Sequence, residues 1–381
     1  MVDFLLPPIN LVGRGAVKEV GTRSKLLGGK KALICTDPVM VKLGIVDIVK
    51  GYVEEAGLKT VLFEGAEPNP KDKNVVDGVK VYKDEKCDMI ITVGGGSAHD
   101  CGKGIGIMVN HPGKAYDYAG IEMLKHNPPP LVAVNTTAGT ASEVTRHCVL
   151  TNTELNVKFV IVSSRNLPSI AINDPELMVK KPPALTAATG VDALVHAIET
   201  YVTANPNPLA DMCAYRAIQI ISEWLRPAVA NGENLVAREW MTYGSLMAGM
   251  AFSNAGLGYV HAMAHQLGGF FDIPHGVANA ILLPAVAKYN MVSNLKRFAE
   301  IAVAMGENID GLSDREAACK AIDAMAQLTK DVGIPSGLRE LNVEKSSFDK
   351  MAEFALKDGN AGCNPIQGTK EDIIKLFEDA Y

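Results

Sequence analysis

The pattern of apolar residues changes near residue 182 and divides the chain into two parts. In the first part, amphipathic stretches alternate with short apolar runs, at 31–36, 60–65, 88–96 and 131–136. This alternation is typical of βαβ units, and nearly continuous Val, Ile and Leu in the runs indicates strands that are covered on both faces. We therefore predict an α/β domain with a mostly parallel sheet, whose ligands bind at the carboxyl ends of the strands.

The second part carries helical patterns instead of strands, the longest at 209–231, 236–252 and 314–332. Two prolines, at 182 and 183, disfavour helix in the residues before them and permit a helix to start just after. We predict two domains, residues 1–181 and 182–381, the second all-α, with a cleft between them. The length of 381 residues agrees with two domains, because a single hydrophobic core rarely supports so long a chain.

The composition argues against several classes of protein. A net charge of -6, with Lys and Arg scattered among the acids, disfavours a nucleic-acid partner. No window reaches the roughly 18 apolar residues of a membrane helix, and the acidic start, MVDFLLPPIN, suits an edge strand better than a signal peptide. Seven widely spaced cysteines without a Cys-x-x-Cys pair suit a reducing cytoplasm, where we expect the protein.

A glycine-rich turn, GGGSAHDCGKGIG, directly follows the predicted strand at 88–96. Three successive glycines let the backbone approach a ligand, and Ser97 is a suitable N-cap for a helix whose free N–H groups would bind a pyrophosphate. The spacing departs from the Gly-x-Gly-x-x-Gly fingerprint, so a plain tight turn is an equally good interpretation.

Two further features favour a nucleotide site. Asp37 ends an earlier strand and could bind an adenosine ribose while repelling a 2′-phosphate, although an aspartate before a proline is more often a turn residue. The turn 135–145 follows another strand with four threonines and a serine, more hydroxyls than a connection needs. Together these features predict NAD as the ligand rather than NADP.

Three of the eight histidines lie within one short stretch, HAMAHQLGGFFDIPH. His261 and His265 are four residues apart on one predicted helix, and His275 lies in a predicted loop after it. Asp192 and His196 are four apart on another predicted helix, so their side chains share a face. A single histidine is more often structural than a ligand, but polar pairs on apolar helices need something to bind. The set predicts a site for Fe(II), Zn(II) or another divalent transition ion.

With these residues in view, the chain resembles the iron-containing (group III) alcohol dehydrogenases, and within them the 1,3-propanediol dehydrogenases. The likeness covers essentially all 381 residues, and the motifs that carry it are GGGSAHDCGKGIG, AVNTTAGTASEVTRHCVLTNTELNVKFVIV, LTAATGVDALVHAIE and LGYVHAMAHQLGGFFDIPHG. The resemblance implies a dehydroquinate synthase-like architecture, with an N-terminal α/β domain that binds NAD and a C-terminal helical domain that binds metal. It places the active site in the cleft between them.

The resemblance also implies roles for single residues. Asp192, His196, His261 and His275 would bind the metal, whereas His265 would be a catalytic residue near the nicotinamide and not a ligand. NAD would be bound by Asp37, Asn69, Gly95, Gly96, Ser97, Asp100, Thr136, Thr137, Thr140, Lys158 and Leu177. The metal would be Fe(II), with Zn(II) or Mn(II) as substitutes, and the chains would assemble into dimers or larger homo-oligomers, up to decamers.

The implied reaction interconverts a small primary alcohol and its aldehyde, first of all 1,3-propanediol and 3-hydroxypropanal, as in glycerol fermentation. Alternatives are 1,2-propanediol with lactaldehyde, ethanol, methanol and glycerol. A lyase of the dehydroquinate synthase type would need basic residues for an anionic substrate, but 191–201 and 258–275 contain no Lys or Arg. This pattern favours a neutral substrate. A non-catalytic metal- or nucleotide-binding protein, such as a sensor, is the other alternative.

The chain departs from its relatives at two positions. Relatives often have a histidine where this chain has Ala285, and an arginine where it has Ile366. Neither position is an assigned ligand, so we expect the chemistry to be retained. The departures could affect the rim of the pocket, the substrate preference or the packing of subunits.

Overall fold

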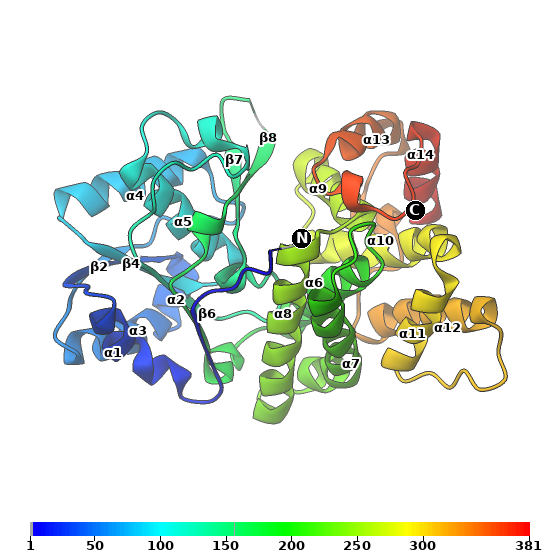
Figure 1. Ribbon diagram of the computed structural model, residues 1–381, viewed down its shortest axis with the longest axis horizontal. Coiled ribbons are helices and arrows are strands. Elements are labelled where there is room, and N and C mark those ends of the chain that lie inside the picture. Colours follow the sequence, from blue (N-terminus) through cyan, green and yellow to red (C-terminus); the bar gives the residue numbers. More distant parts are fainter. Residues whose placement is uncertain (1–2, 156) are drawn as a thin grey trace. The chain divides into compact units, whose positions relative to one another are not determined.

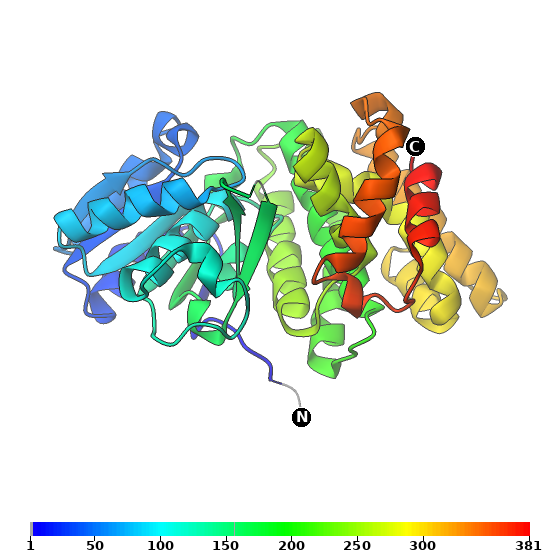
Figure 2. The same cartoon turned by 90° about the horizontal axis from the view of Figure 1, so that it is seen from above.

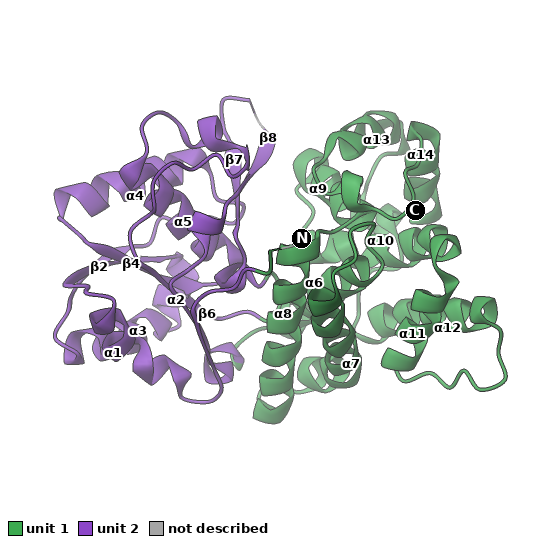
Figure 3. Ribbon diagram, viewed as in Figure 1, with its two compact units in different colours: residues 1–4, 138–140, 179–381 green, residues 5–137, 141–178 purple. Residues whose placement is uncertain are grey.

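The computed structural model describes residues 3–155 and 157–381, which form two compact units (Figure 3). The α/β unit comprises Leu5–Thr137 and Ala141–Met178. The helical unit comprises Ala138–Thr140 and Val179–Tyr381, together with Asp3 and Phe4. Among the described residues, no helix is both long and apolar enough to cross a membrane.

A six-stranded parallel sheet forms the centre of the α/β unit (Figure 1). In spatial order its strands are β1 (Ile9–Val12), β9 (Ile170–Asn173), β6 (Leu131–Asn135), β4 (Met89–Gly94), β2 (Lys31–Thr36) and β3 (Lys59–Phe63). The four predicted strands are confirmed as β2, β3, β4 and β6. The edge strand predicted for residues 1–10 is observed only from Ile9, as β1, because the described residues 3–8 form no strand. Every residue of β4, β6 and β9 is buried, which explains their nearly continuous apolar sequences.

Helices cover both faces of this sheet. They are α1 (Val20–Leu26), α2 (Pro38–Lys42), α3 (Ile45–Glu55), α4 (Asp72–Asp84) and α5 (Gly96–Asn110). Successive residues of a strand point to opposite faces. Accordingly, Ile34 packs in the core that contains Val49 of α3, whereas Leu33 packs in the core that contains Ile105 of α5.

A second, three-stranded sheet in the α/β unit was not predicted. It has the order β5 (Gly120–Ile121), β8 (Val157–Val162) and β7 (His147–Asn152), and β7 and β8 pair antiparallel. Residues of β7 alternate between partly exposed and buried. Continuous apolar runs indicate strands that are buried on both faces, so that criterion misses a pair of half-buried strands.

The helical unit consists of nine α-helices and short 3₁₀ segments within its described residues. The helices are α6 (Pro183–Tyr201), α7 (Pro208–Ala230), α8 (Leu235–Ala255), α9 (Tyr259–Phe271), α10 (His275–Asn290), α11 (Leu295–Ala304), α12 (Asp314–Asp331), α13 (Phe348–Lys357) and α14 (Lys370–Asp379). Figure 2 shows this helical course from green to red. The helices predicted at 209–231, 236–252 and 314–332 are confirmed as α7, α8 and α12.

Helix α6 lies in the middle of the helical unit and begins where the two prolines predict a start. Pro183 occupies its first turn, where the missing N–H of proline costs no hydrogen bond. From Gly190 to Tyr201 every residue is buried, because α7, α8 and α10 all pack against this helix. Polar side chains in this segment therefore need partners within the protein or a bound ligand.

Candidate metal and nucleotide sites

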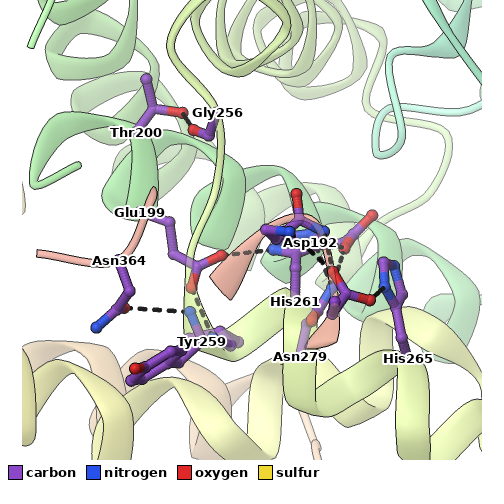
Figure 4. A network of polar contacts seen from close by, with 12 residues as sticks. Asp192, Glu199, Thr200, Gly256, Tyr259, His261, His265, Asn279 and Asn364 are labelled. Atoms are coloured by element: carbon purple, nitrogen blue, oxygen red, sulfur yellow. Dashed lines mark hydrogen bonds and ion pairs between the residues drawn. The ribbon is translucent and has the colours of Figure 1, made fainter. Parts of the chain in front are cut away.

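Three of the predicted metal ligands converge within the helical unit, and Figure 4 shows two of them, Asp192 and His261, with Asn279 beside them. Asp192 comes from α6, His261 from α9 and His275 from α10. One ligand atom of each lies within 4.8 Å of the other two, and Oδ1 of Asp192 is 3.7 Å from Nε2 of either histidine. The prediction of a loop at His275 is wrong, since this residue begins α10 after Pro274. The ring of His275 is therefore held by the first turn of α10.

An amide nitrogen lies at the centre of these three residues. Nδ2 of Asn279 donates to Oδ1 of Asp192 at 2.6 Å, and it is 3.2 Å from Nε2 of His261 and 3.1 Å from Nε2 of His275. The amide has two hydrogens for three possible acceptors, and its own Oδ1 is buried without a hydrogen-bond partner. The site has more acceptor atoms than hydrogens, so its chemistry fits a cation. Asn279 was not predicted, although it follows His275 by one helical turn.

His196, the fourth predicted ligand, lies beside the group of three and is not part of it. Its ring stacks on the rings of His261 and Phe252, with centroids 4.5 and 4.3 Å away. Burial lowers the pKa of both His196 and His261, which keeps the rings in the neutral form that binds metals. Nδ1 of His196 is buried without a hydrogen-bond partner, which supports a ligand role for this ring.

Glu199 holds His261 in place and was not predicted. Its Oε2 lies 2.6 Å from Nδ1 of His261, and its Oε1 accepts a hydrogen bond from the N–H of Val260 at 2.6 Å. With the proton on Nδ1, the lone pair of Nε2 is directed towards the ligand group. Burial raises the pKa of Glu199 to about 8, and a nearby cation would oppose this shift by favouring the carboxylate. The seven-residue spacing from Asp192 places both carboxylates on one face of α6.

Close packing of α10 on α6 depends on Gly276, next to His275. A Cβ at this position would lie 2.3 Å from the backbone oxygen of Ala188 on α6. We expect Gly276→Ala to force the two helices apart, to move His275 away from Asp192, and to lower the free energy of unfolding by about 1–3 kcal/mol. Denaturant unfolding and the metal content of the purified protein measure the two effects.

Gly269→Ala is the matched control for this substitution. Gly269 is exposed on α9, and a Cβ there would have no atom within 4 Å. Because glycine is unfavourable inside a helix, this change should stabilise the protein by about 0.5–1 kcal/mol and leave the metal content unchanged. Wild-type stability and metal content in Gly276→Ala would contradict the close approach of the helices.

His265 lies one turn after His261 on α9, and its ring stacks on that of His275 with centroids 5.4 Å apart. Its Nδ1 is 2.7 Å from Oδ2 of Asp358, which directly follows α13. The ring nitrogens of His265 do not belong to the compact ligand group. The ring therefore lies beside the candidate metal site with one nitrogen already bonded to a carboxylate.

In the α/β unit, several predicted nucleotide residues follow the carboxyl ends of β2, β4 and β6, namely Asp37, Gly95, Gly96, Ser97, Thr136 and Thr137. Strand β2 has β3 on one side and β4 on the other, so the winding of the chain reverses between β2 and β4. Ligands of doubly wound sheets bind at such a switch point. The turns that leave these two strands carry Asp37 and the segment 94–96, so both lie where a nucleotide is expected.

The glycine turn leaves the start of α5 without a side-chain cap. Gly95 is the N-cap, with extended backbone angles, and α5 begins at Gly96. The prediction that Ser97 caps this helix is wrong, because Ser97 already lies within its first turn. A Cβ at Gly95 would be 2.8 Å from Cγ2 of Thr137, so the turn needs glycine there. The first N–H groups of α5 can therefore bind an anion.

Asp37 has a structural role in its own turn. Its Oδ1 accepts hydrogen bonds from the N–H groups of Val39 and Met40, at 2.8 and 3.1 Å, and so caps α2. This is the turn role that the sequence suggests for an aspartate before a proline. Its Oδ2 is 3.5 Å from the position that a Cβ of Gly94 would take. The carboxylate therefore also faces the glycine turn, where a ribose could bind.

Several other predicted NAD residues have contacts within the α/β unit. Nζ of Lys158 donates to Oδ1 of Asn69 at 2.8 Å, which joins residues far apart in the sequence. The N–H of Thr136 donates to the carbonyl of Gly94 at 2.9 Å. Asp100 accepts a hydrogen bond from Ser142 at 2.8 Å.

Two further predicted NAD residues, Leu177 and Thr140, belong to different units. Leu177 is buried in the apolar core of the α/β unit. Thr140 belongs to the helical unit. The turns after β2, β4 and β6 therefore bring Asp37, the glycine turn and Thr136 to one end of the sheet. The NAD contacts of the other residues stay predictions.

Comparisons with known proteins identify the family. Residues 7–175 match the family model described as iron-containing alcohol dehydrogenase, and residues 186–381 match that of the C-terminal region of the same family. The chain belongs to the iron-containing alcohol dehydrogenases. The predicted fold and the resemblance on which it rested are thereby confirmed.

Individual members of the iron-containing alcohol dehydrogenases match the whole chain. The 1,3-propanediol dehydrogenase of Klebsiella pneumoniae is 60% identical over 383 residues, which cover 100% of this chain and 99% of that protein. The NAD-dependent methanol dehydrogenase of Bacillus methanolicus is 44% identical over 380 residues, with 100% of both chains covered. A crystal structure of 1,3-propanediol oxidoreductase is 60% identical and matches with a TM-score of 0.99 over 100% of both chains.

Proposed function

We propose that this alcohol dehydrogenase interconverts 1,3-propanediol and 3-hydroxypropanal, with iron as its metal and NAD(H) as its hydride carrier. The observation that carries the proposal is 60% identity over the whole chain with a dehydrogenase of that diol. The NAD-dependent methanol dehydrogenase, at 44% identity, supports the choice of cofactor.

The proposed iron ligands are Asp192, His196, His261 and His275. One carboxylate and three imidazoles, without a thiolate, suit Fe(II) and also accept Zn(II) or Mn(II). When bound, the ion supplies Lewis acidity to an alcohol or carbonyl oxygen. The chain contributes neutral rings, since burial lowers the pKa of His196 and His261, and it contributes Glu199, which orients the ring of His261.

The proposed NAD site uses backbone groups for the pyrophosphate and side chains for the riboses. The uncapped N–H groups at the start of α5 would bind the pyrophosphate. Asp37 would bind a ribose hydroxyl and repel the 2′-phosphate of NADP, while Lys158, held by Asn69, would donate to a ribose hydroxyl. The remaining proposed contacts are Gly95, Gly96, Ser97, Asp100, Thr136, Thr137, Thr140 and Leu177.

His265 is the proposed proton relay. Oxidation of an alcohol to an aldehyde releases a proton, and reduction takes one up, so the reaction needs a group that exchanges protons with solvent. The ring of His265 lies beside His275 and is held by Asp358. Its other nitrogen would exchange the proton through a water or the nicotinamide ribose hydroxyl.

The surroundings of the proposed ligands favour a small neutral substrate. The segments 191–201 and 258–275, which carry all four proposed ligands, contain no Lys or Arg that would bind a phosphate or carboxylate group. This disfavours a lyase with an anionic substrate. We further propose that the enzyme is a cytoplasmic homo-oligomer of two or more chains, with domains 1–181 and 182–381. All seven cysteines are unpaired thiols, as is usual in a reducing compartment.

A comparison of substrates tests the proposed function. For iron-loaded protein with NAD, we expect kcat/KM for 1,3-propanediol to exceed that for ethanol, methanol, 1,2-propanediol and glycerol by about tenfold or more, since one pocket contact is worth at least that factor. NADP should be used less well than NAD. A clear preference for another alcohol would reassign the substrate, and NAD-linked turnover of none of them would overturn the proposal.

A further inference from the structure

The segment 358–364, which follows α13, contacts α9 at two places, and Figure 4 shows the contact of Asn364 with Tyr259. Oδ1 of Asn364 accepts a hydrogen bond from the N–H of Tyr259, the first residue of α9, at 3.1 Å. Oδ2 of Asp358 lies 2.7 Å from Nδ1 of His265, near the middle of the same helix. One short segment therefore holds both the start of α9 and the ring that we propose as proton relay.

The carboxylate of Asp358 is itself fixed on both oxygens. Its Oδ1 accepts hydrogen bonds from the backbone N–H of Asn360 at 2.9 Å and from Nδ2 of the same residue at 3.0 Å. Burial acts to raise the pKa of Asp358, but the contacts with His265 and Asn360 outweigh it and the net shift of the pKa is downward. Asp358 is therefore ionised at neutral pH and can only accept hydrogen bonds.

An acceptor at Nδ1 determines where His265 carries its proton. Because Asp358 cannot donate, the hydrogen between them belongs to Nδ1, and the neutral ring then has its lone pair on Nε2. We propose that Asp358 is a positioning residue that holds His265 in the Nδ1–H form, so that Nε2 is the atom that exchanges the proton. This inference rests on the proposed role of His265 as the proton relay.

Two contacts fix the plane of the His265 ring as well as its tautomer. His275 stacks on one face, with an interplanar angle of 20°, and Asp358 binds one edge, so a rotation of the ring would lose both contacts. In serine proteases, an aspartate likewise sets the tautomer of the catalytic histidine and does not itself become protonated.

Asp358→Asn tests the proposal, because an amide can donate to Nδ1 and so favours the other tautomer. We expect kcat to fall about 100-fold, the order of a general acid–base contribution, while the metal content and the KM for NAD stay unchanged. In a His265→Ala background, the same substitution should change kcat less than about twofold, since two residues that act as one unit are not additive. If the losses of kcat in the two single variants multiply in the double variant, the proposal is wrong.

A spectroscopic measurement tests the tautomer without reference to activity. In ¹⁵N-histidine-labelled, zinc-loaded protein, the Nδ1 resonance of His265 should be that of a protonated ring nitrogen and the Nε2 resonance that of an unprotonated one. Signals that disappear in His265→Ala identify the residue. The pattern should reverse in Asp358→Asn. An unprotonated Nδ1 in the wild type, or an unchanged pattern in the variant, would overturn the proposal.

Further variants separate positioning from a general structural role. Asp358→Ala should regain part of its lost kcat when formate supplies a carboxylate, and no recovery would count against the proposal. Glu353→Gln is the control, because Glu353 lies on α13 and its carboxylate forms an exposed ion pair with Lys357; its kcat should equal that of the wild type. A fully active His265→Ala would overturn the relay role itself, whereas a defective His265→Ala beside a fully active Asp358→Asn would overturn only the role of Asp358.

Discussion

His261→Ala should lose its bound metal and nearly all NAD-linked turnover. The ring is buried, its Nδ1 is bonded to Glu199, and its Nε2 lies beside Asp192 and Asn279. Loss of a group that only orients a ligand costs roughly 10- to 100-fold in metal affinity. Loss of the ligand itself should lower the metal affinity by more than about 100-fold, and turnover should fall with the metal content. Metal content after gel filtration, measured beside the turnover rate, checks both effects.

The control for His261→Ala is His126→Ala, which changes an exposed histidine of the α/β unit. This variant should keep the metal content and turnover of the wild type. The melting temperature of each metal-free variant shows whether it is folded. A folded His261→Ala protein that keeps a full equivalent of metal would contradict the proposed ligand set.

His265→Ala should lose turnover while it keeps its metal. General acid–base groups contribute about 10²- to 10⁴-fold to the rate, so we expect kcat to fall within that range. The metal content should match that of the wild type, because the ring nitrogens of His265 are outside the ligand group. Added imidazole should restore part of the rate in solution. Equal losses of metal and turnover would instead make His265 a ligand.

The sequence predicts those parts of the fold that depend on local patterns. The strands β2, β4 and β6 are buried on both faces, so their apolar runs are visible in the sequence. The pairs Asp192 with His196 and His261 with His265 are likewise local, because they depend only on helical spacing. Ser97 shows the limit of such reasoning. A serine can cap a helix, but Gly95, two residues before it, adopts the extended angles of the N-cap, and the helix begins at Gly96, two residues earlier than a cap at Ser97 predicts.

The groups that orient the functional histidines could not be predicted in this way. Glu199 lies 62 residues from His261, and Asp358 lies 93 residues from His265. Each carboxylate meets its histidine only when the helices pack together. The residue pattern around either one therefore does not predict the contact. Asn279 is a case between these two. Its four-residue spacing from His275 can be read from the sequence, but an asparagine is a weaker sign of a metal site than a histidine.

The most direct test of the central claim is the reconstitution of metal-stripped protein. NAD(H)-linked turnover of 1,3-propanediol and 3-hydroxypropanal should be absent from the stripped wild type and restored by Fe(II), with Zn(II) and Mn(II) as comparisons. His261→Ala should stay inactive under the same conditions. Turnover by stripped wild type, or equal turnover by His261→Ala, would show that the histidine cluster is not the site of a catalytic metal.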